Sequence, residues 1–100
     1  MTHNENIERA LSYLNELRSI YHDEVGERFV GGISAAIRHL GDQSLPEEER
    51  WSNARSIYKT MAGSKSGFAD VYIEKPTIEQ ILAANRRLDY LRGELWRLFG

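Results

Sequence analysis

Four segments of this chain repeat apolar residues every three or four positions, which is the spacing of amphipathic helices. The first segment starts near Asn4 or Asn6, both good helix caps, and loses its apolar pattern at 22–24. The second runs from about residue 25 to 40, and Gly41 would then take the left-handed conformation that often ends a helix. Gly31-Gly32 inside it would allow another helix backbone to approach closely, or would kink the helix. The apolar positions of these two segments are Ile7, Ala10, Leu14, Leu17 and Tyr21, then Phe29, Ile33, Ala36, Ile37 and Leu40.

The third segment has a clear start signal. Ser44 stands three residues before Glu47, the spacing of a capping box, and Pro46 fits a first helical turn. Three glutamates at 47–49 put negative charge where the helix dipole favours it. We expect the helix to end at Gly63. Its apolar positions are Trp51, Ala54, Tyr58 and Met61.

The last segment has the most regular pattern. Lys75-Pro76 keeps the chain extended, and Thr77 with Gln80 then forms a second capping box. The helix should run to about Phe99, and its apolar seam predicts close packing along the full length of a bundle. The residues of this seam are Ile81, Ala84, Leu88, Leu91, Leu95 and Leu98.

Residues 61–73 interrupt the helical pattern. Gly63 and Gly67 surround the polar run Ser64-Lys65-Ser66, and the chain then becomes apolar and β-prone between Phe68 and Ile73. We expect this stretch to be extended, with one or two short strands. The whole pattern predicts an all-α protein of one domain, residues 1–100, folded as a four-helix antiparallel bundle with a short extended loop between its third and fourth helices.

Composition limits the class of protein without giving its function. The chain has 41% apolar and 28% charged residues, typical of a soluble globular domain, and no apolar run long enough to span a bilayer. It has no cysteine, which excludes disulfides and thiolate chemistry and is consistent with a cytoplasmic location. Its net charge of −2 argues against general nucleic-acid binding, and its polar amino terminus is unlike a secretory leader.

Groups that could carry chemistry are few and dispersed. The run 63–67 superficially resembles a phosphate-binding loop, but it lacks the P-loop spacing and follows a helix end. An enzyme would have to be built on Ser64, Lys65, Asp70 and a histidine, and no partner base is evident beside them. The three histidines, at positions 3, 22 and 39, do not have metal-ligand spacing. We therefore expect no enzyme activity, no metal and no cofactor.

Several large or charged side chains have two interpretations. The glutamates at 47–49 either complement the helix dipole or form an acidic patch for a basic partner. Four arginines of the last helix, at 86, 87, 92 and 97, are expected on a solvated outer face. Trp51 and Trp96 are expected in the core or at its edge.

The loop offers the best candidates for a partner contact. Asp70 and Asn85 are each expected to satisfy backbone groups of the loop. Aromatic residues in or beside a loop are favoured interface anchors, although at least one of Phe68 and Tyr72 should fold back over the bundle. The residues assigned to partner binding are Phe68, Asp70, Tyr72, Glu47, Glu48 and Lys65.

The loop and the last helix also carry a longer pattern. It reads Gly67-Phe68-x-Asp70-x-x-Ile73, then Asn85, then Leu88-Asp89-x-Leu91-x-x-x-Leu95. This pattern resembles a family of small uncharacterised bacterial proteins with a Gly-Met-Gly-Ser-Phe-Asn-Asp-Leu type of loop before a terminal helix, and Trp51 is similar to that family's upstream tryptophan. Ala69 stands where the family usually has asparagine, and the methionine-glycine part is altered. The resemblance implies a fold and little chemistry, because the family has no established activity.

Small proteins of this kind are often immunity or antitoxin proteins encoded beside toxin genes. We therefore expect a cytoplasmic protein-binding module that neutralises a bacterial toxin by direct binding. The alternative is a structural or oligomerising helical protein that forms a homodimer through its last helix.

Overall fold

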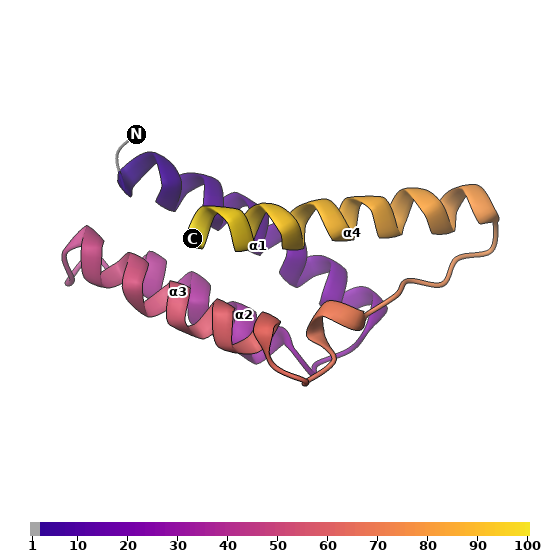
Figure 1. Ribbon diagram of the computed structural model, residues 1–100, viewed down its shortest axis with the longest axis horizontal. Coiled ribbons are helices and arrows are strands. Elements are labelled where there is room, and N and C mark those ends of the chain that lie inside the picture. The colour runs from indigo at the N-terminus through magenta and orange to yellow at the C-terminus, as the bar shows by residue number, and fades with distance from the viewer. Residues whose placement is uncertain (1–2) are drawn as a thin grey trace.

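The computed structural model describes residues 3–100 and confirms the all-α four-helix architecture (Figure 1). The elements are α1 (His3–Glu24), α2 (Val30–Leu40), α3 (Glu47–Gly63), the short 3-10 helix η1 (Phe68–Asp70) and α4 (Ile78–Phe99). No strand forms between residues 3 and 100, so the strands expected after residue 68 are wrong. The chain instead coils into η1, and the stretch that follows is extended but has no neighbouring strand with which to pair.

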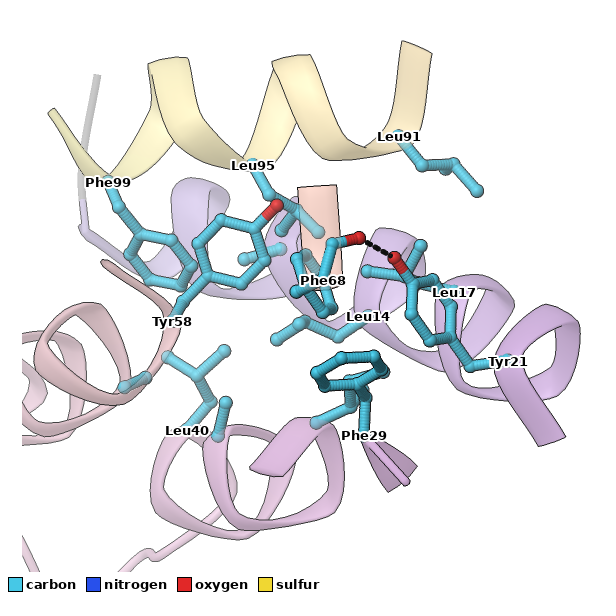
Figure 2. Packing of buried hydrophobic residues seen from close by; sticks show 14 of the residues in the cluster. Leu14, Leu17, Tyr21, Phe29, Leu40, Tyr58, Phe68, Leu91, Leu95 and Phe99 are labelled. Carbon is cyan, nitrogen blue, oxygen red and sulfur yellow. Dashed lines mark hydrogen bonds between the residues drawn. The ribbon is translucent and has the colours of Figure 1, made fainter. Parts of the chain in front are cut away.

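The core lies where the apolar sides of the helices meet. The α1 side chains from Ile7 to Tyr21 that were expected to be buried are buried, and so are Ala54 and Tyr58 of α3. Aromatic rings from α1, α3, η1 and α4, together with Phe29 just before α2, fill the centre (Figure 2). The helical periodicity of the sequence therefore identified most of the core correctly.

Several helix ends differ from those expected. Since α1 already begins at His3, Asn6 lies inside the helix and does not cap it. The second helix begins at Val30, not at residue 25, because Gly26 turns the chain with a positive φ of 102°. Gly41 has φ −88°, so its expected left-handed conformation is wrong.

The two expected capping boxes have different outcomes. Ser44 does not cap α3; its hydroxyl and its backbone N–H both donate to the Asp42 carboxylate, closing a tight turn before Pro46. Thr77 does cap α4, since its hydroxyl accepts the Gln80 N–H at 3.2 Å. Ser44 therefore bonds to the Asp42 carboxylate, two residues before it, instead of capping α3.

The paired glycines of α2 are not identical in role. A Cβ on Gly32 would lie 2.8 Å from the Met61 sulfur of α3, whereas a Cβ on Gly31 would meet nothing within 4 Å. The close approach expected at this pair therefore comes from a side chain of α3 and not from a helix backbone.

Helix α4 packs on the bundle over only part of its length. Of the predicted seam, Leu88, Leu91 and Leu95 are fully buried, whereas Ile81 and Ala84 in the first half of the helix are only partly buried. Beside them, Ile78 and Leu82 are 74% and 54% exposed. The extended segment 71–77 carries the chain past the ends of α2 and α3 before α4 begins, so the first turns of α4 project beyond them (Figure 1). The expectation of close packing along the full length of the helix is therefore wrong.

Polar contacts fix α4 against α1. The Arg87 guanidinium donates to both carboxylate oxygens of Glu16, at 2.6 and 2.7 Å, and this hydrogen bond holds the pKa of Glu16 below its ordinary value. The hydroxyls of Tyr13 and Tyr90 lie 3.3 Å apart in the same interface. The first and last helices of the chain are therefore direct neighbours.

Gly67→Ala is expected to lower the free energy of unfolding by about 1–2 kcal/mol, because Gly67 has φ +95°, a conformation that L side chains avoid. Denaturation in urea, followed by helical circular dichroism, measures the change. Gly93→Ala is the matched control: a Cβ there meets nothing within 4 Å, so alanine should add up to about 1 kcal/mol of stability. Equal effects of the two substitutions would contradict the assigned role of Gly67.

Candidate functional site

The polar run of the loop binds the protein's own backbone. The hydroxyls of Ser64 and Ser66 both donate to the Met61 carbonyl at 3.1 Å, where the last turn of α3 has free acceptors. Arg28, in the turn before α2, donates to the Ser66 carbonyl. These bonds account for the serines as capping groups of α3, with no need of a phosphate ligand.

Phe68, which was assigned to partner binding, is a core residue. Its ring is fully buried and stacks on Tyr21 at a centroid distance of 4.9 Å, with the rings of Phe29 and Tyr58 set edge-on at 5.5 and 5.7 Å (Figure 2). This confirms that one of the two loop aromatics folds back over the bundle. It also removes Phe68 from the candidate surface, because its ring cannot reach a partner in this conformation.

Two polar side chains hold the backbone of η1 in place. The Tyr21 hydroxyl donates to the Phe68 carbonyl at 2.6 Å (Figure 2), and Arg92 Nη1 donates to the same carbonyl at 2.9 Å and to that of Val71 at 3.3 Å. Arg92 Nη2 donates to Asp89 at 2.7 Å. Burial raises the pKa of the Tyr21 hydroxyl, so it remains a proton donor at neutral pH. The position of η1 is therefore fixed from both α1 and α4.

A small cleft, here called the α3–α4 cleft, opens beside η1. Its volume is about 290 Å³, and it lies between the end of α3 and the second half of α4. Tyr58 and Phe68 are its buried residues, and Ala62, Ala69 and Trp96 complete its apolar lining. The lining is rigid, because the hydrogen bonds of η1 and the aromatic cluster hold it.

Trp96 stands half-exposed beside this cleft, at the edge of the core as expected. The Lys59 ammonium lies 3.5 Å from the centroid of the Trp96 ring. It also donates a hydrogen bond to the backbone carbonyl of Trp96 at 3.0 Å. The ring also packs over Gly63, where a Cβ would come within 3.3 Å of it. These contacts hold the indole in one orientation, with part of its surface open to solvent.

The other residues assigned to partner binding do not form one surface. Asp70 and Tyr72 are exposed directly after the cleft residue Ala69, and Lys65 is exposed earlier in the same loop. Glu47 and Glu48 are exposed at the opposite end of α3, which at 17 residues is about 25 Å long. The structure therefore brings the loop residues close to the cleft and leaves the two glutamates far from it.

The expectation for the two polar residues beside the loop holds for one of them. Asn85 accepts the Ile73 N–H at 2.8 Å and donates to the Ile73 carbonyl at 2.9 Å, so one amide satisfies both backbone groups of that residue. The Asp70 carboxylate makes no hydrogen bond within residues 3–100, so its expected role as a turn or cap acceptor is wrong.

Sequence reasoning did not identify Arg92 or Gly93 as part of a site, and the expectation that Arg92 lies on a solvated outer face is wrong, because its side chain is only 12% exposed. Both contribute to the cleft, together with Tyr58 and Trp96. A glycine exposed in the middle of α4, three residues before a tryptophan, is the signal that could have indicated a depression on that helix.

The part of the chain that the structure describes has neither a metal-ligating cluster nor a membrane-spanning helix. No group of three or more His, Asp or Glu side chains comes together there as a metal site, and the His3 side chain lies outside the described residues. None of the helices between residues 3 and 100 has the length and apolar character to cross a bilayer.

Comparison with known proteins adds no relative to these observations. No family model matches the chain, and no curated protein and no solved structure matches it significantly.

Proposed function

We propose that this protein is a small protein-binding module of the immunity or antitoxin type, which neutralises a bacterial toxin by direct binding. The observation that carries the proposal is the α3–α4 cleft, an apolar depression bordered by the fixed and half-exposed Trp96. Interface hot spots are enriched in tryptophan and tyrosine and cluster around well-packed pockets.

The cleft has the size of a side-chain pocket. A volume of about 290 Å³ suits one large apolar side chain of a partner and is at the lower limit for a drug-sized ligand. Because its lining is held by the aromatic cluster and by Arg92, little conformational entropy would be lost when a partner docks.

Groups around the cleft would set the orientation and charge of the partner. Tyr72 is 60% exposed and would add a second aromatic contact, and the Asp70 carboxylate is exposed between Tyr72 and the cleft. The chain has a net charge of −2, so we favour a toxin with a basic surface, such as a nuclease. Glu47 and Glu48 lie at the far end of α3 and are not part of this proposed contact.

Gly93→Leu is expected to abolish partner binding, because the new side chain would occupy the cleft while α4 keeps its fold. The tagged protein and the variant are each used to capture the partner from the source cell, and the captured protein is then expressed alone. We expect it to arrest growth, and we expect the parent chain to restore growth and Gly93→Leu not to restore it.

Gly93→Ala is the matched control, since it adds one methyl group and should leave both capture and growth rescue unchanged. A captured protein that is harmless when expressed alone would contradict the inhibitor function. Growth rescue by Gly93→Leu equal to that of the parent would instead contradict the cleft as the binding surface.

A further inference from the structure

The first half of α4 presents apolar side chains that no other part of the bundle covers. Ile78 and Leu82 are one helical turn apart and are the exposed large aliphatic residues of the described chain. Ala83, beside Leu82, is also exposed, and its small side chain would let another helix approach closely. This surface is separate from the α3–α4 cleft, which begins about three turns beyond Leu82 on α4, at Arg92.

The charged residues of α4 separate into paired and unpaired groups. Three of its arginines, 87, 92 and 97, form ion pairs with Glu16, Asp89 and Glu94. Within residues 3–100, Arg86 and Glu79 make no ion pair and no hydrogen bond through their side chains. The α4 charges without a partner are thus one cation and one anion, and both flank Leu82.

The spacing of these two charges makes the surface complementary to itself. Glu79 and Arg86 are seven residues apart, so they lie on one side of the helix two turns from each other, with Leu82 between them. That side faces away from Leu88, Leu91 and Leu95, which point into the bundle. When two such helices pack antiparallel about a two-fold axis between residues 82 and 83, Leu82 meets Leu82. Glu79 of each helix then lies level with Arg86 of the other.

We propose that a second copy of this chain docks on this surface, so that two α4 helices pair antiparallel through Leu82 and two reciprocal Glu79–Arg86 ion pairs. The contact differs from a dimer built on the seam of α4, because Leu88, Leu91 and Leu95 are already buried within one chain. It does not depend on the proposed inhibitor function, since none of Glu79, Leu82 and Arg86 lines the α3–α4 cleft.

A pairing of a few helical turns buries less surface than the roughly 800 Å² per partner of a standard interface, so the dimer is a weak one. We expect a Kd on the order of 100 μM at low ionic strength, rising as salt screens the ion pairs. Sedimentation equilibrium of the full chain measures it as a rise in mean mass from 11.5 kDa toward twice that value.

The decisive test is a charge exchange. Glu79→Arg or Arg86→Glu alone should raise the Kd at least about tenfold, because each places like charges opposite one another twice in the dimer. The double variant Glu79→Arg with Arg86→Glu restores both pairs and should return the Kd to within about threefold of the parent value. The three variants change only the exposed positions 79 and 86, so circular dichroism should show that the helical fold is intact. The variants without Glu79 should melt slightly earlier, because this glutamate lies in the first turn of α4, where the helix dipole favours negative charge.

Two outcomes would overturn the proposal. A parent chain that stays monomeric at about 1 mM and low salt has no such dimer. A dimer that the single charge reversals leave unchanged, or that the double variant fails to restore, does not form through this side of α4.

Discussion

Phe68→Ala is expected to lower the free energy of unfolding by about 3–5 kcal/mol, the cost of removing a large ring from a packed core. The ring has no solvent exposure and contacts Tyr21, Phe29 and Tyr58, so the cavity would open at the centre of the molecule. Because domains of this size are stable by only about 5–15 kcal/mol, the variant should be largely unfolded in moderate urea. Urea titrations followed by far-ultraviolet circular dichroism give the difference directly.

Phe68→Leu is the control, since it keeps most of the apolar volume and should lose clearly less stability than alanine. The same two variants also distinguish a role of Phe68 in core packing from a role in partner binding. If Phe68 contacted a partner and not the core, alanine would reduce capture of that partner and leave the unfolding midpoint unchanged, contrary to the burial that we describe.

Arg92→Met is expected to lower the free energy of unfolding by about 2–3 kcal/mol. Methionine replaces most of the aliphatic stem but removes the charged donor, which leaves the carbonyls of Phe68 and Val71 with fewer hydrogen bonds in a half-buried site. Denaturation in guanidinium chloride measures the loss, and amide hydrogen exchange should show faster opening around Asp70, whose N–H is bonded within η1.

Arg97→Met tests whether this loss is specific. Arg97 is exposed and forms a surface ion pair with Glu94, so its replacement should cost clearly less stability than Arg92→Met. Similar losses for the two arginines would show that Arg92 does not support η1.

Periodicity was a reliable guide to which residues are buried and a poor guide to where helices end. Leu14, Leu88 and Tyr58 were predicted from spacing alone, because burial of one side of a helix imposes that spacing whatever the fold. Helix ends depend on competition between nearby acceptors, and at Ser44 the Asp42 carboxylate was the stronger competitor. A regular seam also does not say which element covers it, so the partial exposure of the seam residue Ile81 could not be foreseen.

The candidate site was only partly predictable for a related reason. Loop composition pointed to Asp70 and Tyr72, which are exposed. The cleft itself joins residues as far apart in sequence as Tyr58 and Trp96, and such a meeting is decided by tertiary packing. Phe68 was recognised as important, but spacing could not say whether its ring would face a partner or the core.

The pairing of α1 with α4 also sets the order of folding. Helices α1, α2 and α3 follow one another over short connections, so their mutual contacts close small loops. The contacts of Glu16 with Arg87 and of Tyr21 with Arg92 each span 71 residues, and loop closure over that distance is slower. We expect α1, α2 and α3 to form their mutual contacts first, and α4 to close the groove along α1 last.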